Sequence, residues 1–142
     1  MNILIVEDDD YKYKNITRYL KIVDENLTIF RLNNCMDALV YFRTLKNSDK
    51  KFDLLITDNY MPLRSDTFDL SPCASYIINT FRNKVSKEIP VCICSSDEFN
   101  DDCDYNYFVL YEPAKSLQED FIKIISDINY KESKKVLKMP KK

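Results

Sequence analysis

The sequence contains no histidine, no glycine and no tryptophan among its 142 residues. Without histidine, no imidazole is available to act as a general base, to carry a phosphoryl group or to ligate a metal. Without glycine, the chain cannot form a Walker loop, a dinucleotide-binding fingerprint or the nucleophile elbow of a hydrolase. These absences exclude the enzymes that depend on those motifs.

The lack of glycine also affects the turns. Positive φ angles are usually found at glycine, and asparagine and aspartate tolerate them best among the other residues. We therefore expect Asn and Asp to supply this conformation in tight turns at residues 33–34, 47–49 and 104–106.

Long apolar runs and a strong net charge are missing as well. The longest apolar runs have only a few residues, so we predict no membrane-spanning segment and no secretory signal. The formal net charge of −2 creates no overall field that would attract nucleic acid. We expect a cytoplasmic protein with no membrane partner and no direct nucleic-acid binding.

The five cysteines are odd in number and have no Cys-x-x-Cys spacing. This pattern disfavours a zinc site or a disulfide framework and favours reduced, mostly buried thiols. Cys92 and Cys94 alternate within an apolar run, so they should lie on the same face of a strand.

Short apolar runs that favour β-strands recur along the chain. They are continuous rather than alternating, which is typical of strands covered on both faces. A weaker run at 27–32 is compatible with a fifth strand near an edge of the sheet. The four stronger runs are at 3–6, 54–56, 91–94 and 108–110.

Apolar residues at helical spacing follow most of these runs. Asn34 is a plausible N-cap of the second predicted helix. Ser71 followed by Pro72 indicates the start of the third, and Ser116 with Glu119 forms a capping box for the last. The helical patterns lie at 16–23, 36–45, 74–85 and 117–128.

The order βαβαβαβ(α)βα predicts an α/β fold: a five-stranded parallel sheet, doubly wound, with right-handed crossovers. The acidic segment 97–104 has few apolar anchors, so the fourth helix should be short or poorly formed. We expect one domain over residues 1–130 and a Lys-rich tail or linker over 131–142. The tail is either a solvated extension of the last helix or linker, or a basic arm for an acidic partner.

Acidic and hydroxyl side chains follow the ends of the predicted strands. Glu7 and Asp8 follow the first strand, Asp58 the third and Ser95 the fourth. In a parallel sheet these ends meet at one edge, where ligands bind. Clustered carboxylates repel one another unless a cation joins them, and Mg²⁺ prefers oxygen ligands. The pattern predicts a site for Mg²⁺ or another hard divalent cation, beside which Asp58 could attack phosphorus.

At these residues the sequence resembles the receiver (CheY-like) domains of two-component response regulators. Residues 3–9 resemble the first strand and acidic pair of that family. Residues 52–62 resemble its third strand, phosphoacceptor Asp and Met-Pro turn, and residues 89–96 resemble its fourth strand with the switch Ser or Thr. The resemblance covers residues 1–130 and implies a receiver/flavodoxin-like (βα)5 fold.

The resemblance implies that Asp58 accepts a phosphoryl group from a sensor histidine kinase with Mg²⁺ as cofactor. Asp8 would bind the ion directly, Glu7 directly or through water, and the backbone carbonyl of Tyr60 would add a ligand. Ser95 would hydrogen-bond the phosphoryl group and move on activation. Such a phosphoprotein is not an enzyme acting on an external substrate. It promotes at most its own phosphorylation and dephosphorylation, and it signals to a protein effector that the sequence does not identify.

Some of these residues also have purely structural interpretations. Asp9 or Asp10 could cap the first helix, and Ser95 with Glu98 matches a capping box that would serve the backbone instead of a phosphate. Asp58 by itself would be an ordinary loop acid without its Met-Pro context and the convergence of Asp8.

The sequence departs from the family at Glu112-Pro113, where the family has Lys-Pro. That lysine pairs with the phosphoaspartate, so a carboxylate near Asp58 would repel the phosphoryl group instead. In one interpretation, Lys115 or Arg64 replaces the cation, and phosphorylation is retained with atypical switching. In the alternative, the chain is a degenerate pseudo-receiver that binds protein partners independently of phosphorylation.

Two changes of length affect the predicted interaction surface. The loop at 62–71 is longer than is usual in the family, and the stretch at 95–112 is shorter. These changes disfavour the standard dimer and leave a homodimer of non-standard geometry as an option. A flavodoxin-like cofactor protein has the same element order, but the acids at 7–10 would repel a flavin phosphate.

Overall fold

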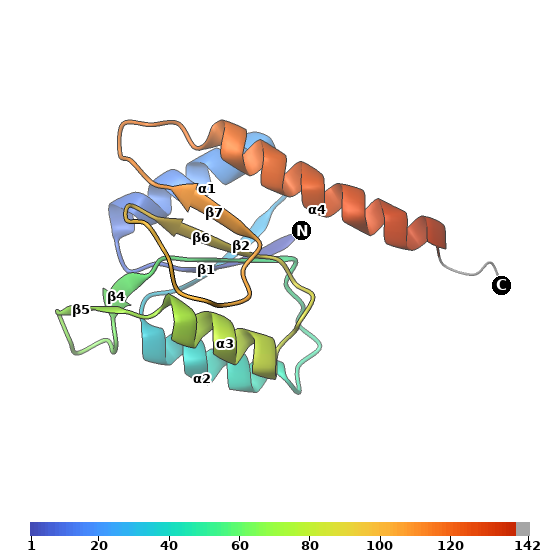
Figure 1. Ribbon diagram of the computed structural model, residues 1–142. Coiled ribbons are helices and arrows are strands. Elements are labelled where there is room, and N and C mark those ends of the chain that lie inside the picture. Colours follow the sequence, from blue (N-terminus) through green and yellow to red (C-terminus); the bar gives the residue numbers. More distant parts are fainter. Residues whose placement is uncertain (139–142) are drawn as a thin grey trace.

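Five parallel strands form the central sheet in the computed structural model of the chain, which describes residues 1–138 (Figure 1). The strand order is β2-β1-β3-β6-β7, so the chain changes direction across the sheet between β1 and β3. This confirms the predicted five-stranded α/β fold. The strands are β1 (Asn2–Val6), β2 (Thr28–Leu32), β3 (Leu54–Thr57), β6 (Val91–Ser95) and β7 (Tyr107–Leu110).

Two helices cover each face of the sheet (Figure 1). Helices α1 (Asp10–Val23) and α4 (Gln118–Lys138) lie on one face, and α2 (Cys35–Leu45) and α3 (Ala74–Lys84) lie on the other. Alternate residues of β1, β2, β3 and β6 therefore enter two separate cores. This arrangement explains the continuous apolar runs of β1, β3 and β6, which are buried on both faces.

The edge strand β7 does not follow that pattern. Val109 is buried, but Phe108 and Leu110 are each 38% exposed. The prediction that this run is covered on both faces is therefore wrong. The physical reason is that residues 96–106 form no helix, so nothing helical from this connection covers the strand. This agrees with the prediction of a shortened or poorly formed fourth helix, since the connection contains no helical turn.

The helix starts agree with the sequence in part. Asn34 caps α2 as predicted, because its Oδ1 accepts a hydrogen bond from the backbone N–H of Asp37 at 2.9 Å. The predicted start of α3 at Ser71-Pro72 is wrong, because these residues belong to a second, two-stranded sheet. That antiparallel pair is formed by β4 (Tyr60–Pro62) and β5 (Leu70–Pro72).

Helix α3 receives its cap from a residue distant in sequence. Asn59 is buried, and its Oδ1 accepts the backbone N–H of Ala74 at 3.1 Å. At α4 the capping contact is shifted relative to the prediction. Ser116 Oγ accepts a hydrogen bond from the N–H of Gln118 at 3.2 Å, two residues along the chain.

The turns are built without the left-handed backbone that was expected at Asn and Asp. No residue in the described part of the chain has a positive φ angle, so that prediction is wrong. Polar side chains stabilise turns by accepting backbone N–H groups instead. Asp24 accepts from Asn26 at 2.9 Å, and Ser48 accepts from Lys50 at 3.0 Å.

The carboxyl-terminal part of helix α4 extends past the sheet (Figure 1). It remains helical to Lys138, so most of the predicted Lys-rich tail belongs to it, while residues 139–142 lie outside the described part. No helix within residues 1–138 is both long and apolar enough to span a membrane. All five cysteines are free and four of them are buried, and Cys92 and Cys94 share one core as predicted.

Candidate functional site

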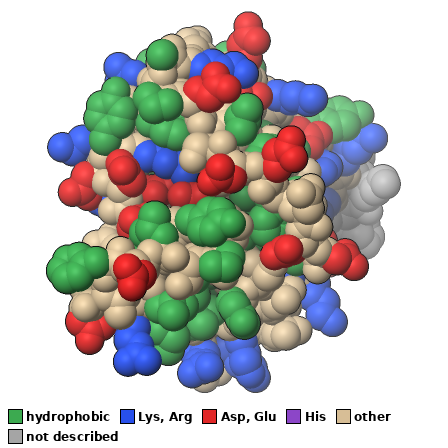
Figure 2. All heavy atoms as spheres, turned by 60° about the vertical axis from the view of Figure 1, so that its left-hand side comes forward, with side chains coloured by type: hydrophobic (Ala, Val, Ile, Leu, Met, Phe, Trp, Pro, Cys, Tyr) green, Lys and Arg blue, Asp and Glu red, His purple; other side chains and the backbone are tan. Residues whose placement is uncertain are grey.

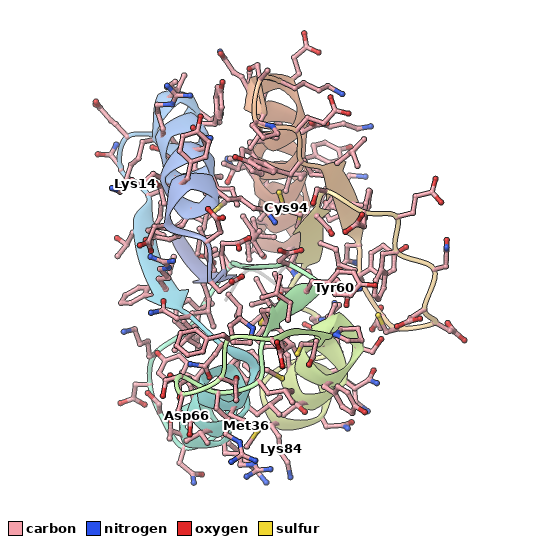
Figure 3. All side chains as sticks on the ribbon, turned by 90° about the vertical axis from the view of Figure 1, so that its left-hand side faces the viewer. Lys14, Met36, Tyr60, Asp66, Lys84 and Cys94 are labelled. Atoms are coloured by element: carbon pink, nitrogen blue, oxygen red, sulfur yellow. The ribbon has the colours of Figure 1, made fainter. Side chains whose placement is uncertain are left out.

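A pocket of about 430 Å³ lies beyond the carboxyl ends of the strands. Figure 2 shows acidic side chains gathered across the middle of this side of the molecule, with hydrophobic side chains above and below. Figure 3 looks onto the same side, where Cys94 lies by the α1–α4 layer and Lys14 on the outside of α1. The residues that line the pocket are Glu7, Asp8, Asp9, Tyr11, Lys12, Asp58, Tyr60, Leu70, Ser96, Asp97, Tyr111 and Pro113.

Three predicted acids meet at this pocket. The carboxylates of Glu7, Asp8 and Asp58 each offer an oxygen within 4.8 Å of the others. The sheet register explains their proximity, since Val6 of β1 pairs with Thr57 of β3 and the next residues leave adjacent strands side by side. The acids thus converge at the topological switch point, as the sequence indicates.

The site also contains an ammonium group that the sequence analysis missed. Lys12 Nζ lies 2.8 Å from Glu7 Oε1 and 3.0 Å from Asp58 Oδ2. It donates a hydrogen bond of 2.7 Å to the backbone carbonyl of Cys94. The ring of Tyr111 lies 5.3 Å from the same nitrogen. Lys12 is only 6% exposed, so its charge is held inside the protein by these groups.

Helix α1 directs Lys12 into the site. Asp9 begins the helix as its N-cap and accepts the backbone N–H of Lys12 at 2.8 Å. Lys12, Ile16 and Leu20 are the buried residues of the helix, spaced four apart along the side that faces the sheet. The sequence signal was a lysine in a core position: such a charge requires a buried partner, and the acids beyond β1 and β3 provide it.

Burial and the mutual repulsion of the acids perturb the pKa values. Burial, followed by the charge of Asp58, raises the pKa of the Glu7 carboxyl to about 7, against the opposing effect of Lys12. Burial also raises the pKa of the Asp8 carboxyl. For Lys12, burial lowers the pKa, but the carboxylates of Glu7 and Asp58 outweigh it, so the pKa lies above its ordinary value.

A second cation, Arg31 of β2, holds the loop that carries the acids. Its guanidinium donates to the backbone carbonyls of Glu7 at 3.0 Å and Asp8 at 3.2 Å. It also pairs with Asp10 at 2.8 Å and lies over the ring of Tyr13 at 4.3 Å. Arg31 therefore fixes the backbone of Glu7 and Asp8 without pairing with the carboxylates of these two residues.

The predicted hydroxyl and carbonyl groups lie at different depths. Ser95 is buried at the end of β6, and its Oγ accepts the backbone N–H of Asp97 at 3.3 Å. The neighbouring Ser96 lines the pocket. Tyr60 is part of the pocket rim and is 40% exposed. The phosphoryl contact of Ser95 and the metal-ligating carbonyl of Tyr60 stay predictions.

Glu112 does not line the pocket, and neither do Lys115 and Arg64. Glu112 is exposed at the end of β7 and forms no ion pair within the described residues. Lys115 and Arg64, the two predicted replacement cations, are exposed as well. The cation that contacts Asp58 is Lys12 instead.

The donor set suits a hard divalent cation. Glu7 Oε1 is buried, and Lys12 Nζ, 2.8 Å away, is its only polar partner among the described residues. An oxygen of this kind can accept a further cation. With Glu7, Asp8 and Asp58 ionised, the three carboxylates and Lys12 carry a net charge of minus two, which one Mg²⁺ would balance.

Comparison with known proteins identifies the fold. No model of a known protein family matches the sequence, and no curated protein matches it. Solved structures do match. The amino-terminal domain of a response regulator/sensory box/GGDEF protein from Carboxydothermus hydrogenoformans has a TM-score of 0.67 and 16% identity, covering 96% of this chain and 99% of that one.

Two further structures of this kind are similar. The phosphorylated cyanobacterial phytochrome response regulator RcpA has a TM-score of 0.63 and 18% identity, with 90% of each chain covered. RcsB from Salmonella enterica, bound to a promoter with the phosphomimetic BeF3⁻, has a TM-score of 0.60 and 18% identity, covering 89% of this chain and 67% of that one. The chain therefore has the fold of response regulator receiver domains.

Proposed function

We propose that the chain is a two-component receiver that accepts a phosphoryl group on Asp58 from a sensor histidine kinase. The observation that carries this proposal is the meeting of Asp58, Glu7 and Asp8 at one pocket on a receiver fold. The carboxylates are at the switch point of the sheet, where this fold class binds its ligands. The structures of similar fold named above include a phosphorylated response regulator and one solved with a phosphomimetic.

The transfer would proceed by attack of one Asp58 carboxylate oxygen on phosphorus. The new O–P bond forms as the P–N bond of the phosphohistidine breaks, and its electron pair stays with the imidazole nitrogen, which solvent protonates. In the free protein, Asp58 Oδ1 accepts the backbone N–H of Asn59 at 2.6 Å, which holds the carboxylate in place. Hydrolysis of the resulting acyl phosphate would return the protein to its starting state.

Glu7, Asp8 and Asp58 would hold Mg²⁺, with the Tyr60 carbonyl as a further ligand. When bound, the ion would neutralise charge on the transferring phosphoryl oxygens. The protein's own contribution is to fix the acids: Arg31 holds the backbone of Glu7 and Asp8, and Asp9 N–H donates to Glu7 Oε2 at 3.1 Å.

The output of such a cytoplasmic receiver would be atypical. Residues 96–106 form no helix, and β7 leaves Phe108 and Leu110 partly exposed beside this connection. We propose a protein effector or a homodimer of non-standard geometry as the recipient of the signal. No output through direct contact with nucleic acid is proposed for this domain.

The test is phosphorylation by a small donor. The protein is incubated with Mg²⁺ and phosphoramidate, and intact mass is followed for wild type, Asp58→Asn and the control Asp66→Asn, an exposed acid on the hairpin loop. We expect label on wild type and Asp66→Asn and none on Asp58→Asn. Absence of label on wild type, with label on Glu112→Lys, would contradict the proposal and support a pseudo-receiver.

A further inference from the structure

We infer that Lys12 is the cation that binds the phosphoryl group on Asp58, in place of the lysine that the end of β7 lacks. The inference rests on the proposed function and assigns a role within that site to a residue of helix α1. It applies to the reacting centre directly, because Lys12 Nζ lies 3.0 Å from the Asp58 carboxylate.

The first argument is charge. A phosphoryl group brings a charge of about −2 at neutral pH into a pocket that already contains Glu7 and Asp8. Lys12 is the only lysine or arginine among the described residues that line this pocket. An anion formed on Asp58 therefore has this ammonium as its nearest positive partner in the protein.

The second argument is position and burial. The aliphatic stem of Lys12 is enclosed with Ile16 and Leu20 under helix α1, and its nitrogen ends beside Asp58 Oδ2. Its three protons face three acceptors: Glu7 Oε1, Asp58 Oδ2 and the Cys94 carbonyl. A buried ammonium held this way is already in position to contact the phosphoryl oxygens of phosphorylated Asp58, so Lys12 need not move in from solvent.

The third argument is the exchange of partners that phosphorylation imposes. In the free protein, Lys12 is shared between Glu7 and Asp58. Once Asp58 carries terminal phosphoryl oxygens, the stronger anion draws the ammonium and leaves the Glu7 carboxylate to the divalent ion. Lys12 also bonds the carbonyl of Cys94, next to Ser95, so this exchange is transmitted to the end of β6.

The experiment compares Lys12→Met, which keeps the length of the stem and removes the charge, with Lys14→Met on the exposed side of the same helix. Two measurements are made on each: the initial rate of labelling with Mg²⁺ and phosphoramidate, and the rise in melting temperature on adding Mg²⁺ alone. A third sample with Mg²⁺ and BeF3⁻ measures stabilisation by a phosphoryl mimic without any reaction.

We expect Lys12→Met to lower the labelling rate by about tenfold or more and to remove most of the BeF3⁻ stabilisation. Stabilisation by Mg²⁺ alone should persist or increase, because a competing cation has gone. Lys14→Met should match wild type. These opposite changes separate a phosphoryl contact from simple damage to the site, which would weaken both responses.

Labelling of Lys12→Met at the wild-type rate, with wild-type stabilisation by BeF3⁻, would overturn the inference and leave the proposed function intact. Absence of label on wild type as well as on Asp58→Asn would instead overturn the proposed function. If Lys12→Met does not fold, the comparison moves to Glu7→Gln against the Glu7→Gln/Lys12→Met double variant, which contains no unpaired Glu7 charge. A rate equal in these two would overturn the inference.

Discussion

The buried ion pair between Lys12 and Glu7 should contribute a large, measurable coupling energy to stability. Their charged atoms are 2.8 Å apart, and their side chains are 7% and 2% exposed. At an effective dielectric constant of about 20, two unit charges at this separation attract by roughly 6 kcal/mol, and desolvation offsets part of it. We expect a coupling of about 2–4 kcal/mol between the two side chains.

The assay is a double-mutant cycle with Lys12→Met and Glu7→Gln, measured by urea unfolding without divalent ions at about pH 8. Lys12→Met alone should cost about 3–5 kcal/mol, because the buried Glu7 and the partly buried Asp58 then lack their cation. The double variant should recover part of that loss, because one of the two unpaired carboxylates is neutral.

The matched control is the exposed pair Lys135–Glu132 on α4. Its charged atoms are 3.6 Å apart, and both side chains are 62% exposed. Such a pair should show a coupling of only a few tenths of a kcal/mol. A coupling for Lys12 and Glu7 no larger than this control would refute the claim that the ammonium is held by buried charges.

Three further outcomes follow from the site and its surroundings. Because the pKa of Glu7 is raised from 4.5 to about 7 in the folded protein, folding favours its protonated form. The free energy of unfolding without metal should therefore fall by about 3 kcal/mol as the pH rises from about 4.5 to about 7. If Glu7→Gln leaves this dependence of stability on pH unchanged, Glu7 is not its cause. Mg²⁺ should raise the melting temperature, and Asp8→Ala should remove the effect; a melting curve insensitive to Mg²⁺ would argue against the metal site. Asn59→Ala should lower the free energy of unfolding in urea by about 1–2 kcal/mol, since the N–H of Ala74 loses its acceptor; no change would show that this cap is dispensable.

Local sequence patterns determined the layers of the fold and the acids of the site. The apolar runs that become β1, β3 and β6 are buried on both faces, so continuous hydrophobicity was sufficient to recognise them. Glu7, Asp8 and Asp58 follow strands directly, and a parallel sheet brings such positions together whatever the details of packing. The N-cap at Asn34 was predictable because its acceptor and donor are three residues apart.

Features that depend on distant contacts were decided only in three dimensions. The start of α3 was misplaced because its cap comes from Asn59, 15 residues earlier, and Ser71-Pro72 pairs with β4 instead. The exposure of β7 depends on a connection that fails to form a helix.

The charge balance of the site was decided in the same way. Lys12 resembles any helix lysine in the sequence, yet its nitrogen reaches a carbonyl 82 residues away and the carboxylates of Glu7 and Asp58, which directly follow two neighbouring strands. A lysine's long stem can bury itself along a core and place its charge wherever the surrounding strands end, and only the packing of α1 on the sheet determines that point.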